Sequence, residues 1–196
     1  MSLEAWALAA TQSLVIYHED VGSPEKPAQQ EMIARAVTEA ARETKGWRGG
    51  SRKNLIAAAL GMLDNETHGS LRIHRNECNL KKRECDGGRA ISLFQLHANA
   101  LSAPEVWPTL GFMTFESTKL SAREATRILV RSYNTCAAQK VPGDPIALMY
   151  TATAGQGCRL DKWQGWKPRV ATYERMLRVP VPKLAVAQAE SAPRID

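Results

Sequence analysis

The chain has 196 residues, which is enough for one well-packed domain with or without tails. Hydrophobic residues make up 44% of it and aromatic residues only 6%, and the apolar share is rich in alanine, which favours helices over sheets. No apolar run reaches the roughly 18–20 residues of a membrane span, so we expect no transmembrane helix.

The net charge of +6 attracts polyanions, either nucleic acid or an acidic cell-wall polymer. The basic residues are spread along the chain, with local clusters only in HRN and LKKRE. A spread charge is more typical of a solvated surface than of a nucleic-acid-binding stripe. We therefore expect no nucleic-acid partner.

The N-terminal segment MSLEAWALAATQSLVIYHED is partly apolar, but it carries Glu4 where a secretion signal has basic residues. It shows no clear signal peptide. We interpret residues 1–27 as a helical arm that ends at the break GSPEKP, which contains two prolines and a glycine.

Apolar residues at helical spacing predict a series of helices further along the chain. The capping-box pair Ser121 and Glu124 places the start of one of them near residue 122. The predicted helices cover residues 28–45, 52–64, 122–138, 146–155 and 169–177, with a polar loop at 67–88. Pro180 and Pro182 prevent a regular helix at the C-terminal junction. The sequence predicts a mainly α, single domain at 28–178 with a flexible tail at 179–196.

Four cysteines, Cys78, Cys85, Cys136 and Cys158, can pair in three ways. In an oxidising compartment we expect at least one local bridge, Cys78 with Cys85 or Cys136 with Cys158. A zinc site with His68 and His74 is an alternative, although the spacing matches no standard zinc module. Free, buried thiols are a third alternative.

Glu66 follows the apolar stretch NLIAAALGML at the end of a predicted helix. Burial against apolar neighbours disfavours a charged carboxylate, and so does the negative end of the helix dipole. A carboxylic acid held in this way can protonate the leaving oxygen of a glycosidic bond. The alternative is a solvated helix end with no chemical role.

Three short motifs follow one another in the order ETHG (66–69), SLFQ (92–95) and YTATAG (150–155). In this order they resemble the lysozyme-like superfamily, in particular soluble lytic transglycosylases and goose-type lysozymes. The resemblance covers roughly residues 52–177. It implies a lysozyme-like domain with Glu66 as the catalytic acid and Gln95 and Tyr150 lining a sugar cleft.

The chain also departs from the pattern of that superfamily. Ser92 stands where glycine is usual, Phe94 where methionine is usual and Thr151 where asparagine is usual, and the segment between Glu66 and Gln95 is about ten residues longer. Ser92 and Phe94 remain candidate substrate-binding residues, because they belong to the second motif.

A second catalytic carboxylate is the other requirement of most glycosidases. Asp86 is the best-placed candidate, with Glu77 and Glu84 behind it, and solvated loop charges are the alternative for all three. We expect Tyr133, in the sequence SYN, to belong to the core. His68, His74 and His97 are expected at the surface or at the substrate edge.

The resemblance implies a muramidase that cleaves the β-1,4 bond between N-acetylmuramic acid and N-acetylglucosamine in peptidoglycan. A single acid–base Glu favours a lytic transglycosylase, with a 1,6-anhydro product, over a hydrolase. We expect a monomer that needs no cofactor or metal and is periplasmic, secreted or virion-borne. The alternatives are a non-enzymatic basic helical protein that binds glycan or nucleic acid, and a lysozyme-like domain that binds glycan without cutting it.

Overall fold

The computed structural model describes residues 2–16, 18–79, 81 and 84–180. It is mainly helical, which confirms the mainly α character predicted from the sequence. The α-helices are α1 (Leu3–Gln12), α2 (Lys26–Glu43), α3 (Arg52–Thr67), α4 (Leu71–His74), α5 (Cys85–Gly88), α6 (Phe115–Ala138), α7 (Pro145–Thr153) and α8 (Trp166–Arg178). The remaining elements are strands β1 (Ala90–Ile91) and β2 (Leu96–His97) and the 3-10 helices η1 (His18–Asp20), η3 (Ala98–Ala100) and η4 (Pro104–Gly111).

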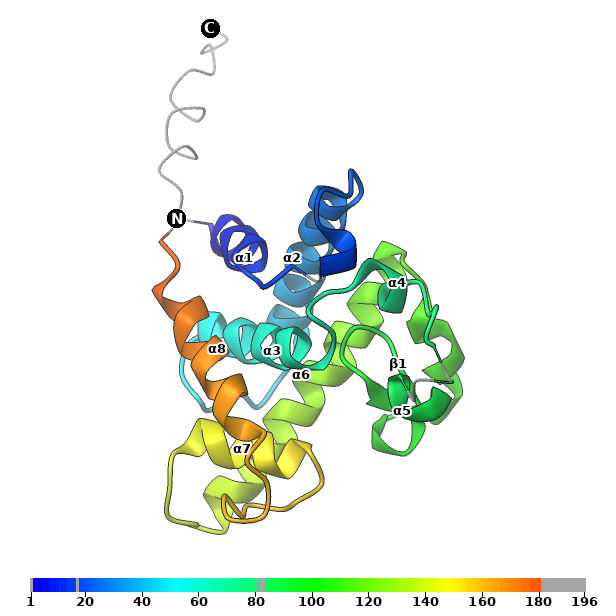
Figure 1. Ribbon diagram of the computed structural model, residues 1–196. Helices are drawn as coiled ribbons and strands as arrows, with labels where there is room; N and C mark the ends of the chain where they lie inside the picture. Colours follow the sequence, from blue (N-terminus) through cyan, green and yellow to red (C-terminus); the bar gives the residue numbers. More distant parts are fainter. Residues whose placement is uncertain (1, 17, 80, 82–83, 181–196) are drawn as a thin grey trace, which may run out of the picture.

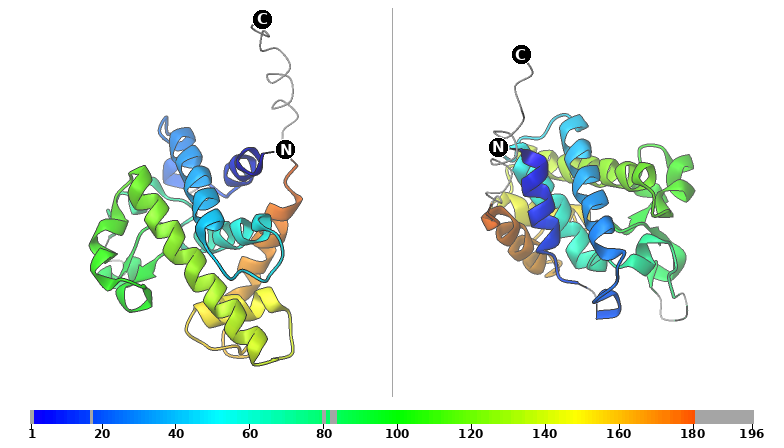
Figure 2. Two further views of the ribbon diagram at one scale, coloured as in Figure 1. Left: turned by 180° about the vertical axis from the view of Figure 1, so that it is seen from behind. Right: turned by 90° about the horizontal axis from the view of Figure 1, so that it is seen from above.

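Helix α3 is the central element of the core. Its residues 55–63 are buried all round, as expected for a helix that is apolar on every side. Figure 1 shows α8 lying alongside α3. The view from behind in Figure 2 shows the long helix α6 crossing α2 and α3. Alanine at three successive positions of α3, 57–59, leaves room for these neighbours to approach closely.

Helix α1 belongs to the same core, which differs from the separate arm expected for residues 1–27. Trp6, Ala7 and Ala10 are buried against α2 and α3. The Ser2 hydroxyl oxygen accepts a hydrogen bond from the Ala5 N–H at 3.2 Å and caps the helix. The described part of this segment is therefore continuous with the domain. Of the tail expected at 179–196, only the first two residues are described.

The start of α6 also differs from the prediction. The helix begins at Phe115, where the side chain of Thr114 caps its N-terminus. Ser121 and Glu124 lie inside the helix, and the buried Glu124 carboxylate accepts hydrogen bonds from the N–H and hydroxyl of Ser102 at 2.9 and 2.7 Å. The Ser121 hydroxyl donates to the Leu110 carbonyl at 3.1 Å. Both members of the pair that fits a capping box thus make tertiary contacts, which spacing alone does not distinguish from a cap.

The segment 67–88, predicted as a polar loop, contains α4 and α5 and is anchored by a buried ion pair. Lys26 Nζ donates to the Asp20 carboxylate at 3.2 Å and to the Gly69 carbonyl at 2.5 Å, and Asp20 also accepts from the Leu71 N–H at 2.8 Å. Burial lowers the pKa of Lys26, although the bond to Asp20 opposes this effect. These contacts fix the chain where it leaves α3.

His74, expected at the surface or the substrate edge, is buried at the end of α4. Gln29 Nε2 lies 3.1 Å from His74 Nδ1, and Thr118 Oγ1 lies 2.8 Å from Nε2. The Thr118 hydroxyl already donates to the Thr114 carbonyl, so the His74 ring donates from Nε2 and accepts at Nδ1. Burial and the nearby Lys26 lower the pKa of His74 to about 4, so the imidazole is neutral.

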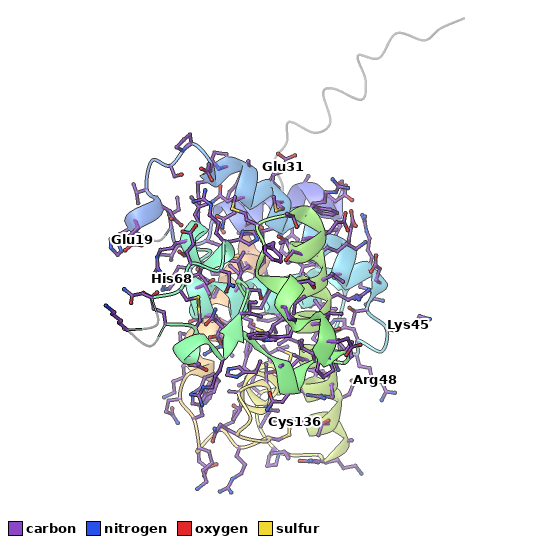
Figure 3. All side chains as sticks on the ribbon, turned by 90° about the vertical axis from the view of Figure 1, so that its right-hand side faces the viewer. Glu19, Glu31, Lys45, Arg48, His68 and Cys136 are labelled. Atoms are coloured by element: carbon purple, nitrogen blue, oxygen red, sulfur yellow. A yellow bond between two sulfur atoms is a disulfide. The ribbon has the colours of Figure 1, made fainter. Side chains whose placement is uncertain are left out.

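Both local disulfides are present, Cys78–Cys85 and Cys136–Cys158. The second joins the end of α6 to the loop after α7, and Figure 3 shows Cys136 at the end of the molecule opposite Glu31 of α2. The first closes the loop before α5. Both bridges lie in the part of the chain that surrounds the candidate site. None of the described helices is both long enough and apolar enough to cross a membrane.

Candidate active site

A cavity of about 320 Å³ lies beside the C-terminal half of α3. In Figure 1 the elements α4, α5 and β1 lie on one side of α3, and α7 lies towards the other with α8. The residues that line the cavity come from segments far apart in the sequence: Met62, Glu66, Asp86, Gln95, His97, Tyr150, Thr153, Ala154, Trp163 and Arg169. Four of the predicted site residues, Glu66, Asp86, Gln95 and Tyr150, are therefore brought together.

Glu66 occupies the last turn of α3, which ends because His68 adopts a left-handed conformation with φ of 49°. The Glu66 side chain is 28% exposed, and its Oε1 accepts a hydrogen bond from a terminal nitrogen of Arg169 in an ion pair. This environment differs from the apolar surroundings predicted for Glu66. A guanidinium in contact favours the ionised carboxylate over the protonated acid.

Gln95 reaches the cavity because a tight turn joins β1 to β2. Ala90 pairs with His97 and Ile91 with Leu96, and the four intervening residues reverse the chain. Ser92 and Gln95 both have positive φ, 68° and 48°, in this turn. The Gln95 side-chain amide donates to the Ser92 carbonyl at 2.9 Å, so its orientation is fixed.

The end of α3 is tied to this turn, which explains why Glu66 and Gln95 share one cavity. The Thr67 hydroxyl donates to the Leu93 carbonyl at 3.0 Å and also lies 3.2 Å from the carbonyl of Leu63 within α3. One buried threonine thus links the helix to the hairpin.

Ser92 and Phe94 have structural roles here and do not line the cavity. Ser92 is 2% exposed, and its hydroxyl oxygen accepts from the Phe94 N–H at 3.3 Å within the turn. Phe94 is 1% exposed and packs in the main core. Neither side chain is available for substrate contact in this conformation.

Asp86 faces the same cavity as Glu66 from the α5 segment. Asp86 Oδ2 lies 2.9 Å from His97 Nε2, and the Asp86 side chain is 62% exposed. His97 therefore lies at the cavity edge, as the sequence suggested. Of the other two acidic candidates, Glu84 pairs with Arg72 at 2.7 Å, and neither Glu77 nor Glu84 is among the lining residues.

Tyr150 reaches the cavity from α7, but its side chain is only 1% exposed. Its hydroxyl donates to the Ala58 carbonyl of α3 at 2.8 Å. Burial raises the pKa of Tyr150, with Arg169 opposing this effect and Tyr173 adding to it. The buried phenol therefore locks α7 onto α3 and closes the inner wall of the cavity.

Arg169 and Trp163 were not among the residues singled out from the sequence. The Arg169 guanidinium lies 4.5 Å from the centre of the Trp163 ring, and one of its terminal nitrogens donates to the Gly165 carbonyl at 2.8 Å. The sequence KWQGWKPR, with two tryptophans among basic residues, was the available signal. Its significance depends on α8 packing against α3, which no local pattern reveals.

The zinc alternative lacks its thiolate ligands, since Cys78 and Cys85 are bonded to each other. Within the described ranges no three His, Cys, Asp or Glu side chains are grouped so as to hold a metal ion. His68 lies 3.7 Å from the carboxylate of the buried Asp64. Tyr133, expected in the core, is partly buried and packs against Trp47 with ring centres 5.0 Å apart.

Comparisons with known proteins assign no family to the chain. No protein-family model matches it, and no curated protein or solved structure gives a significant match.

Proposed function

We propose that the protein is a peptidoglycan-cleaving muramidase with a lysozyme-like domain, acting on the β-1,4 bond between N-acetylmuramic acid and N-acetylglucosamine. The main support is the cavity that gathers Glu66, Asp86 and Gln95 from three separate segments of the chain. The motif order ETHG, SLFQ and YTATAG supports the same function independently of the cavity. Two disulfides suit a periplasmic, secreted or virion-borne protein.

Glu66 is the proposed catalytic acid, because it is the lining carboxylate that is mounted on a rigid, buried helix. Gln95 is the proposed sugar-binding amide, since the bond to the Ser92 carbonyl holds its orientation. Tyr150 shapes the inner wall through its bond to the Ala58 carbonyl. A rigid frame of this kind lowers the cost of aligning the glycosidic oxygen with the acid.

We favour a lytic transglycosylase over a hydrolase. The other lining carboxylate, Asp86, is largely exposed and is bonded to His97, so it is a poor candidate for a buried partner of Glu66. With one acid–base Glu, the 6-hydroxyl of the muramic acid attacks intramolecularly and gives a 1,6-anhydro product. Such attack gains several kcal/mol from pre-positioning, without a dedicated base to activate water.

The test is digestion of purified peptidoglycan, with products identified by mass spectrometry. Glu66→Gln should lower the rate at least about 10²-fold, because the amide keeps the shape but cannot donate the proton. Glu174→Gln, which alters an exposed carboxylate on α8, is the matched control and should cleave like the wild type. Cleavage by Glu66→Gln within about threefold of wild type would remove Glu66 from the mechanism.

A second candidate function is glycan binding without cleavage. The observation that favours it is the ion pair of Glu66 with Arg169, in which the carboxylate already accepts a hydrogen bond from the guanidinium. Retention of the wild-type protein on peptidoglycan with no new reducing or anhydro ends after prolonged incubation would select this function.

A further inference from the structure

The ion pair between Glu66 and Arg169 conflicts with the role of Glu66 as an acid. A general acid must carry a proton when the substrate is bound, whereas a guanidinium in contact stabilises the carboxylate. Arg169 is itself well held, by the Gly165 carbonyl at 2.8 Å and by the face of Trp163. Its side chain is 13% exposed, so part of it is accessible from the cavity.

The segment that supplies Arg169 to the cavity wall carries a net positive charge. Residues 159–178 contain six Arg and Lys and two Asp and Glu, a net charge of +4 out of the +6 of the whole chain. This segment also contributes Trp163 to the lining. The Arg169 guanidinium over the Trp163 ring makes this part of the wall cationic and aromatic, which suits a sugar ring that bears an acidic substituent.

The charged and titratable groups around Glu66 come from three directions. Arg169 faces it from α8, Tyr150 lines the cavity from α7, and Asp86 with His97 lines it from the hairpin side. Asp86 and His97 are bonded to each other and the Tyr150 hydroxyl to a backbone carbonyl. Arg169 is the group in direct contact with Glu66 and the one that can exchange an acidic partner.

We propose that Arg169 binds a carboxylate of the glycan strand, and that this exchange of partners releases Glu66 to act as the acid. The inference rests on the proposed function. Arginine can bind a carboxylate through two parallel N–H···O bonds, so a substrate carboxylate can replace Glu66 without leaving the guanidinium unpaired. Once released, Glu66 takes up a proton from solvent and donates it to the glycosidic oxygen.

The substrate carboxylate has two sources in peptidoglycan. One is the lactyl group of N-acetylmuramic acid where the stem peptide has been removed, and the other is an acidic residue of the stem peptide. A strand of N-acetylglucosamine alone has neither. Arg169 therefore determines specificity, because an uncharged strand leaves Glu66 paired with Arg169.

The test compares kcat/KM on three soluble tetrasaccharides. The first alternates N-acetylglucosamine and N-acetylmuramic acid with free lactyl groups, the second carries acidic stem peptides, and the third is neutral tetra-N-acetylchitotetraose. The wild type should prefer at least one acidic substrate to the neutral one by about tenfold or more, as expected for a charge-assisted contact. The acidic substrate with the higher rate identifies the source of the carboxylate.

Arg169→Gln should abolish this preference by lowering the rate on acidic strands, while the rate on the neutral strand stays the same or rises. A purely structural role of Arg169 would lower both rates together. Arg178→Gln, which removes an exposed charge from the same helix, should match the wild type.

Arg169→Lys is the second variant, because it keeps the positive charge and loses the paired N–H donors. It should lose part of the preference for acidic strands. If Arg169→Gln and Arg169→Lys both cleave peptidoglycan, and both keep the wild-type ratio of rates on the acidic and neutral tetrasaccharides, the inference is overturned and the muramidase proposal stands. If the wild type cleaves none of the three strands and no peptidoglycan, both fail.

Discussion

Gly61 lies in the part of α3 that is buried all round, next to Tyr150 of α7 and Arg169 of α8. Gly61→Ala is the sharpest test of this packing. A Cβ at this position would lie 2.5 Å from the Tyr150 hydroxyl oxygen and 3.0 Å from the Arg169 carbonyl oxygen. Neither atom moves easily, because the Tyr150 hydroxyl is bonded to the Ala58 carbonyl and the other atom belongs to the backbone of α8.

The expected change in the free energy of unfolding has the opposite sign to that of the same substitution in an exposed helix. There, replacing glycine by alanine stabilises by about 1 kcal/mol. Overpacking of a core costs about 1–3 kcal/mol, and a 2.5 Å contact with an anchored atom belongs at the upper end of that range. The net loss should be about 2 kcal/mol, which is about 4–8 °C in the melting temperature of a chain of this size.

The assay is urea unfolding followed by far-ultraviolet circular dichroism, in a double-mutant cycle with Tyr150→Phe. Removing the hydroxyl deletes the closest contact, so Gly61→Ala should cost less in the Tyr150→Phe background, with a coupling of about 1 kcal/mol. Gly61→Ala with an unchanged or raised melting temperature, or with full additivity in the cycle, would refute this account of the packing.

Two further predictions concern stability. Replacing both Cys136 and Cys158, which are 22 residues apart, by alanine should lower the free energy of unfolding by about 3 kcal/mol. The same replacement of Cys78 and Cys85, seven residues apart, should lower it by about 2 kcal/mol, because a shorter closed loop restricts the unfolded chain less. Equal losses measured by urea unfolding would count against this ordering. Burial lowers the pKa of His74 from 6.5 to about 4 in the folded protein. Between these two pH values the unfolded chain therefore binds more protons than the folded protein, and the free energy of unfolding falls by about 3 kcal/mol as the pH drops from about 6.5 to 4. The slope of unfolding free energy against pH in that window should flatten in His74→Gln, and an unchanged slope would assign it to other groups.

The sequence by itself determined the helical class, because alanine-rich stretches with apolar residues at helical spacing can bury a continuous surface only as helices. It also located the helix that ends near Glu66, since the apolar stretch before it and the glycine after it are local signals. Local closeness of the cysteines in the chain favoured the two bridges that the structure contains. Each of these inferences depends on neighbours in sequence.

Tertiary structure alone decided the surroundings of each site residue. Glu66 has Arg169 as its partner rather than apolar neighbours, because α8 packs beside α3 from 103 residues away. Tyr150 is buried where α7 meets α3, and the turn in SLFQ directs Phe94 into the core while Gln95 reaches the cavity. The charge and burial at a site depend on which elements, distant in sequence, pack together there. A local motif carries no information about that packing.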